Sequence, residues 1–151
     1  RANLPADTSA IDDTATITAA VLHIFDFNGG SGAGPTVASV VTTTQPSNTA
    51  LTTADYDLYG SSDLGNTSLT HGQAVGTEFT FTISSPDTNI SKTGFTKLGL
   101  REKNRDLANV AAVNDYFYQF CSSEHATSAY RPYYAVTYTL PSTFVARVMV
   151  I

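Results

Sequence analysis

The sequence predicts an all-β protein: an antiparallel β-sandwich, jelly-roll-like, with one or two short helical turns. Apolar and polar residues alternate with a period of two, segments rich in Gly, Pro, Ser and Asn interrupt this alternation, and helical spacing is nearly absent. The chain has 151 residues, about the length of one domain. A domain of this size buries roughly 68–70% of its unfolded surface, so its core needs no disulfide to support it.

The expected strands follow the alternating runs. Phe79 and Phe81 alternate with threonines, as on a strand with one buried face. Residues 16–27 are apolar on both faces, which is typical of a central strand in a sandwich. Together with the other alternating and β-branched runs, these patterns predict strands over residues 16–27, 37–44, 79–83, 95–103, 116–120 and 134–139.

Turn-forming residues separate these runs. Residues 28–35 read Asn-Gly-Gly-Ser-Gly-Ala-Gly-Pro, which neither a helix nor a strand tolerates. One helical turn is expected within residues 51–59, with Thr52 or Thr53 as its N-cap, and a second at residues 90–92. Shorter breaks are expected at residues 45–48, 84–87 and 140–142.

No internal repeat or linker divides the chain, so residues 1–140 are predicted to form a single β-sandwich domain. Residues 141–151 differ, because they end in a very apolar strand-like run. If it were exposed, such a strand would be prone to pair with other chains and aggregate. We therefore expect it to pack on the same domain or on a neighbouring copy. This assembly strand is expected to use Phe144, Val145, Val148, Met149, Val150 and Ile151.

Charge excludes several classes of partner. The net charge is −5 and the eight basic residues are scattered or interleaved with acids, so we expect neither nucleic acid nor an anionic membrane surface as a partner. No apolar run reaches the roughly 18 residues that insertion into a membrane as a helix requires. Only 14% of the residues are charged, against about 25% in a typical domain. Hydroxyl and amide side chains replace them, which favours an extracellular, virion or cell-surface location.

The chain contains one cysteine, Cys121, so an intrachain disulfide is excluded. We expect a buried free thiol there, and a link between two chains is the alternative. The chain begins with Arg1 rather than Met, so we expect a processed form, a fragment or the ordered part of a longer chain.

Catalytic motifs are absent from the sequence. There is no G-x-S-x-G turn, H-E-x-x-H helix or phosphate-binding loop. The three histidines lie far apart along the chain, and most aspartates lie in turns, where they hydrogen-bond their own backbone. We therefore expect no enzyme activity and no catalytic residue.

Two kinds of binding site remain candidates. Loop carboxylates could converge on structural calcium, the one cofactor considered, because hard cations take several oxygen ligands. The carboxylates are Asp12, Asp13, Asp55, Asp57 and Asp63. Aromatic rings near strand ends could stack on a glycan, helped by a polar pair in a loop. These candidates are Tyr56, Tyr59, Glu124, His125, Tyr130 and Tyr133, and structural turns or core packing are the alternatives throughout.

Four segments carry strand and turn motifs of one known family. They are residues 15–25, with the sequence ATITAAVLHIF, then residues 47–56, residues 89–99, and residues 120–124 taken together with 131–138. In these segments the chain resembles the DNRLRE-type jelly-roll modules of secreted bacterial proteins and of phage and prophage surface proteins. The resemblance spans about residues 4–140. It implies a jelly-roll sandwich and is nearly silent on activity.

The chain departs from that family at both ends. Such modules usually have a strand before the equivalent of Leu4 and Pro5, where this chain has almost nothing, and it carries an extra strand after Pro141. We hypothesise that residues 144–151 take the vacant position, in their own domain or in an adjacent copy by strand addition. An ordinary C-terminal strand on its own sheet is the alternative.

These observations favour a non-catalytic structural or assembly module of a virion, fibre, filament or cell-surface protein. Its partners would be further copies of the chain, in a homo-oligomer, or other subunits of a surface assembly. The second hypothesis is a carbohydrate-binding module of a secreted bacterial protein, with a glycan as its ligand.

Overall fold

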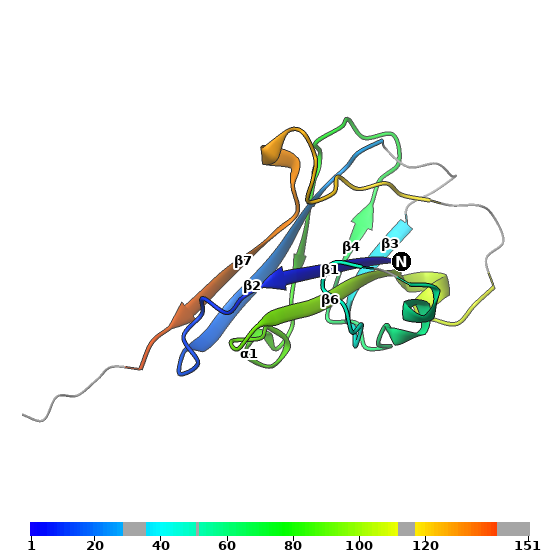
Figure 1. Cartoon of the computed structure of the whole chain (residues 1–151). Coiled ribbons are helices and arrows are strands. Elements are labelled where there is room, and N and C mark those ends of the chain that lie inside the picture. Colours follow the sequence, from blue (N-terminus) through cyan, green and yellow to red (C-terminus); the bar gives the residue numbers. More distant parts are fainter. Residues whose placement is uncertain (29–35, 51, 112–116, 142–151) are drawn as a thin grey trace, which may run out of the picture.

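The computed structural model describes residues 1–28, 36–50, 52–111 and 117–141. These residues form two antiparallel sheets (Figure 1), which confirms the predicted all-β sandwich. One sheet has the strand order β1-β6-β3-β4, and the other has the order β5-β2-β7. Within the described residues the strands are β1 (Ala2–Asp7), β2 (Thr16–Phe25), β3 (Thr36–Thr42), β4 (Gly65–Leu69), β5 (Glu78–Thr82), β6 (Phe95–Glu102) and β7 (Tyr133–Thr139).

The core lies between the sheets and is built from alternating side chains. In β5, Phe79 and Phe81 are buried while the polar residues around them are exposed. In β2 the pairing register with β7 shifts between Ile17 and Ala19, so that the inward-facing positions change phase there. After this irregularity, the residues of β2 that have no exposed surface are Ala20, Leu22 and Ile24.

Residues 43–50 and 52–60 cover part of the outer face of the four-stranded sheet. They contain the 3-10 helix η1 (Thr53–Leu58), which confirms the helical turn predicted within residues 51–59. The backbone N–H of Thr52 donates to the buried Asp55 carboxylate at 2.6 Å and fixes the start of this helix. Tyr59 packs on Gly99 so closely that a Cβ atom at Gly99 would lie 2.4 Å from the tyrosine ring.

The other helical segments are short. They are α1 (Pro86–Asn89), a π-helical turn η2 (Lys103–Leu107) and a 3-10 turn η3 (Ser128–Tyr130). The prediction of a helical turn at residues 90–92 was wrong, because the turn forms at α1, where Pro86 presets the backbone at the first helical position. In the part of the chain that the structure describes, no helix combines the length and apolar character needed to cross a membrane.

Sequence reasoning missed two strands and misplaced another. Strands β1 and β4 were not predicted. The strand expected over residues 116–120 was wrong for residues 117–120, which have isolated bridges at Phe117 and Phe120, the latter with Asp26, and no strand ladder. Tyr118 and Phe120 still pack against the core, so the alternation is present without a strand ladder. Outside the described residues lie the predicted assembly positions Phe144, Val145, Val148, Met149, Val150 and Ile151.

The edge strands β4 and β5 close one side of the sandwich. The backbone of Gly65 lies so close to β5 that a Cβ atom there would be 2.1 Å from the Thr82 carbonyl oxygen. The hydroxyl of Thr67 donates a hydrogen bond to the carbonyl of Thr80 across the same boundary. The two sheets therefore meet at this side without room for an intervening strand.

We expect Gly65→Ala to lower the free energy of unfolding by about 1.5 kcal/mol, because the added methyl group pushes backbone against backbone at the closed side. Urea denaturation measures this change. The matched control is Gly94→Ala, since no atom lies within 4 Å of a Cβ atom at Gly94; its effect should stay within about 0.5 kcal/mol. Equal effects of the two substitutions would contradict the close approach of β4 and β5.

Candidate functional site

On the opposite side of the sandwich, the described residues leave two strand edges unpaired. Strand β7 pairs with β2 along one edge, and within the described residues no strand pairs with its other edge (Figure 1). Strand β1 is likewise the last strand of its own sheet. The phenol of Tyr134 in β7 donates a 2.9 Å hydrogen bond to the carbonyl of Leu4 in β1, so the two free edges lie on the same side of the molecule.

A cavity of about 710 Å³ opens between these two edges. We call it the β1–β7 groove. Its apolar lining includes Leu22 and Ile24 of β2, which belong to the core cluster. Other apolar lining residues, from β1, β6, β7 and the segment before η3, are Leu4, Leu100, Tyr118, Phe120, Tyr134 and Val136. Polar residues such as Asn3, Asp7 and Asn48 also line it. The groove is an opening on the surface, and its volume lies within the range of pockets that bind ligands.

The strand count explains the shape of the groove. A jelly roll has eight strands in two sheets, whereas the described residues supply four strands to one sheet and three to the other. Because β4 and β5 already meet at the closed side, the position left for a further strand is beside β7. The β1–β7 groove therefore lies where the described residues supply one strand fewer than a jelly roll has.

The two edges of the groove differ in their capacity to accept a strand. Pro5 lies within β1 and has no N–H to donate, so it interrupts any ladder on that edge. Strand β7 has the sequence Tyr-Tyr-Ala-Val-Thr-Tyr-Thr, without the proline, lysine or other charges that usually protect an exposed edge. The unprotected edge is therefore that of β7.

Buried polar groups in and around the groove remain neutral or unsatisfied. Burial raises the pKa of the Tyr134 phenol well above its ordinary value of 10, which keeps it protonated as a donor to Leu4. Burial, with a contribution from the Asp26 carboxylate, raises the pKa of Tyr118 to about 12. The side-chain oxygens of Asn3 and Asn48 are buried and accept no hydrogen bond from the described residues; both asparagines line the groove.

Cys121 also lines the groove, and it is a free, buried thiol as expected. Burial, together with the nearby Asp26 carboxylate, raises the pKa of the thiol above its ordinary value of 9.0. A thiol held in its protonated form is a poor nucleophile, so Cys121 acts as a small apolar residue of the groove wall.

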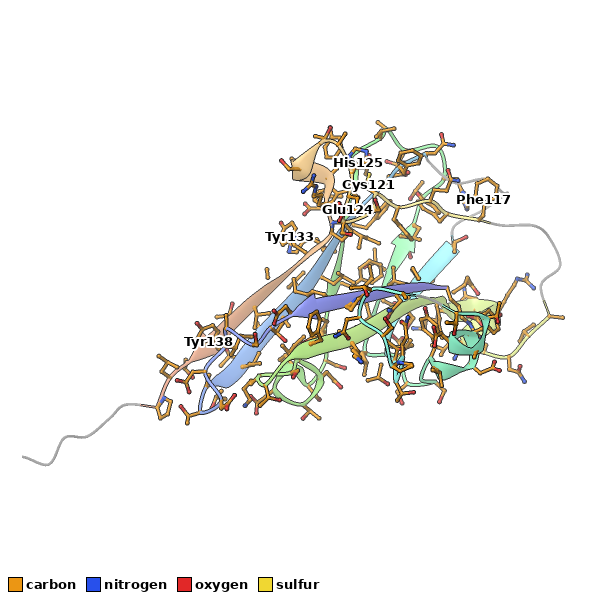
Figure 2. All side chains as sticks on the ribbon, in the orientation of Figure 1. Phe117, Cys121, Glu124, His125, Tyr133 and Tyr138 are labelled. Carbon is orange, nitrogen blue, oxygen red and sulfur yellow. The ribbon has the colours of Figure 1, made fainter. Side chains whose placement is uncertain are left out.

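A second surface gathers aromatic rings near the first residues of β7. We call it the aromatic cluster; it consists of His23, Phe25, Phe27, His125, Tyr130 and Tyr133. The rings of His23 and Tyr133 stack with their centroids 4.3 Å apart. Phe25 lies 6.1 Å from Tyr130, measured between ring centroids. Figure 2 shows His125 and Tyr133 at the same end of the strand, far from Tyr138.

Three of the predicted glycan-binding residues therefore come together in this cluster. His125 lies edge-on to Phe27 at 6.1 Å and near Tyr130 at 5.7 Å, measured between ring centroids. Glu124, also predicted, is exposed beside His125. Sequence reasoning missed His23, Phe25 and Phe27, although the outward positions of the strand predicted over residues 16–27 were a usable signal for them.

The other two predicted tyrosines lie elsewhere. The guanidinium carbon of Arg1 lies 3.8 Å from the ring centroid of Tyr56 and 5.8 Å from that of Tyr59. Arg1 also pairs with Asp106 at 2.6 Å, and Arg101 pairs with the same carboxylate at 3.0 Å. Tyr56 and Tyr59 thus belong to a structural network around Asp106 and not to the aromatic cluster.

The candidate calcium ligands are not brought together. Within the described ranges, no three His, Cys, Asp or Glu side chains form a group that could hold a metal ion. Asp12 accepts hydrogen bonds from Thr14 in its own turn, and Asp55 holds the start of η1. Asp63 pairs with Lys103 at 2.8 Å. Asp13 and Asp57 are exposed. A structural calcium ion remains a prediction from the sequence.

Comparison of the chain with protein-family models, with curated proteins and with solved structures returned no match. The two surfaces described above, the β1–β7 groove and the aromatic cluster, are therefore the basis for assigning a function.

Proposed function

We propose that the protein is a non-catalytic structural module that assembles with further copies of itself in a virion, fibre, filament or cell-surface structure. The observation that carries this proposal is the edge of β7 with which no strand of the described residues pairs, beside the partly apolar β1–β7 groove. Proteins that expose a long strand edge normally blunt it or cover it. Because the β7 edge carries no such protection and apolar side chains lie beside it, we take this edge as the surface through which copies assemble.

The composition supports the same proposal. The surface relies on hydroxyl and amide groups, because only 14% of the residues are charged. Among the described residues, no three His, Cys, Asp or Glu side chains form a group that could hold a metal ion, and the pKa of the Cys121 thiol is raised. A role in display, adhesion or subunit assembly outside the cytoplasm depends on the shape and surface of the fold, and it requires no catalytic group.

Size-exclusion chromatography with light scattering tests this proposal. We expect the full chain to elute as an oligomer whose mass exceeds the 16.0 kDa of one copy at every concentration examined. A monomer across the whole concentration range would contradict the assembly role.

A second candidate function, binding of carbohydrate, is favoured by the aromatic cluster. The exposed faces of Phe27 and Tyr133, each about half exposed, offer apolar rings of the kind that stack on sugars. Glu124 and the His23–Glu78 pair, whose Nδ1 and Oε1 atoms lie 2.6 Å apart, supply polar groups beside them. A monomeric chain that is retained on a polysaccharide column would favour this function over assembly.

A further inference from the structure

We infer that residues 144–151 of a neighbouring copy fill the β1–β7 groove and pair antiparallel with the free edge of β7. This inference rests on the proposed assembly function and names its partner segment. The strand pairs among the described residues are all antiparallel, so an antiparallel strand beside β7 continues the pattern of the sheet.

The length of the segment matches the edge it would join. Strand β7 has seven residues, which span about 23 Å at roughly 3.3 Å per residue. Residues 144–151 are eight in number and span about 26 Å in the same conformation. One copy of the segment can therefore pair along the whole of β7.

The side-chain pattern of the segment matches the groove. Because successive residues of a strand point to opposite faces, one face of the segment carries Phe144, Ala146, Val148 and Val150. That face is entirely apolar and suits the partly exposed apolar side chains of the groove wall, Leu4, Tyr134 and Val136. The other face carries Arg147, the one charged residue of the segment, beside Val145, Met149 and Ile151; Arg147 therefore decides which face turns to solvent.

The connection after β7 favours a neighbouring copy over the same chain. A tight hairpin usually needs Gly, Asn or Asp in its loop to supply a positive φ angle. Residues 140–143 have the sequence Leu-Pro-Ser-Thr and contain none of these. Pro141 directs the backbone of Leu140 toward an extended form, which suits a wider turn but supplies neither positive φ angle of a two-residue hairpin. The chain is therefore better suited to leave its own sheet than to fold back along β7.

Strand donation of this kind has a consequence for the assembly. Each copy gives one strand and receives one, and the donating and receiving surfaces are different. Such a head-to-tail contact generates a ring when the rotation closes and a filament when it does not. Both forms fit a fibre or surface assembly, and neither requires a two-fold symmetric dimer.

The test compares two substitutions in the full chain, Val148→Glu and Val145→Glu. They make the same chemical change three positions apart, but period-two alternation places Val148 on the groove face and Val145 on the outer face. Light scattering should show that Val148→Glu reduces the mass to that of one copy. Val145→Glu should keep the oligomer of the unaltered chain. Circular dichroism checks that both variants retain their strands.

The outcomes separate this inference from the function on which it rests. If the unaltered chain is oligomeric and Val148→Glu leaves it so, the strand donation is overturned while the assembly function stands. If both variants become monomeric, the assignment of one face to the groove is overturned. If the unaltered chain is monomeric, the assembly function and the donation between copies are both overturned.

Discussion

Replacing Phe81 by alanine is expected to lower the free energy of unfolding by about 4 kcal/mol. Phe81 lies on the inner face of β5 and has no exposed surface. It is among the largest fully buried side chains of the described core. Its removal loses apolar burial and leaves a cavity that the surrounding strands cannot collapse to fill. Equilibrium denaturation in urea, followed by circular dichroism, measures the change.

The matched control for this experiment is Phe95→Ala. Phe95 opens strand β6, but its side chain is 43% exposed, so truncation should cost less than about 1 kcal/mol. If the two substitutions had similar effects, the assignment of the inner face of β5 to the core of the sandwich would be contradicted.

Asp106→Asn is expected to lower the free energy of unfolding by about 2 kcal/mol at neutral pH, because hydrogen bonds to charged groups are stronger than neutral ones. The Asp106 carboxylate receives hydrogen bonds from Arg1 and from Arg101, with distances of 2.6–3.1 Å. The substitution leaves both arginines near an uncharged group. We place the cost well below that of a fully buried pair, because the Asp106 side chain is 24% exposed and solvent screens its charge.

The contribution of Asp106 should depend on pH in a definite direction. Burial alone would raise the pKa of its carboxyl, but the hydrogen bonds and charges of Arg1 and Arg101 outweigh burial and hold the pKa far below the ordinary value of 3.8. The native state therefore binds the proton less readily than the unfolded chain does. Stability from this group is complete above the unfolded pKa of about 4 and is lost as the pH falls through the lower native value.

Urea denaturation of the unaltered chain and of Asp106→Asn at several pH values measures this dependence. The difference between the two proteins should be largest near pH 7 and should shrink steadily below about pH 4. Other carboxylates with lowered pKa values, such as Asp63, remain in both proteins, so their effects cancel in the comparison. A difference that is constant down to pH 2 would contradict the ionic role of Asp106.

The strands with strong alternation could be predicted from the sequence, and the weakly patterned ones could not. Phe79 and Phe81 mark β5 because large apolar and polar residues alternate there. Strand β4 has the sequence Gly-Asn-Thr-Ser-Leu, in which only Leu69 is buried, so it lacks a periodic apolar signal. Strand β1 pairs along its whole length with β6, although Pro5 and its small side chains are poor indicators of a strand.

The candidate site was predicted only in part, because its geometry depends on strand order. His125, Tyr130 and Tyr133 were chosen for lying near loops or strand ends, and the fold does bring them together. Tyr56 was chosen on the same grounds but packs with Arg1. The β1–β7 groove has no local sequence signal at all, since it arises from the division of strands between two sheets. What the sequence did contain was the apolar run of residues 144–151.

Amide hydrogen exchange along β7, resolved to single residues, tests the central claim most directly. On an edge strand of an antiparallel sheet, alternate N–H groups point away from the neighbouring strand and are open to solvent. If a donated strand covers this edge, consecutive amides of residues 133–139 should all exchange slowly in the assembled protein. In Val148→Glu, every second amide should exchange quickly. Fast exchange at alternate β7 amides in the assembled, unaltered chain would contradict the account.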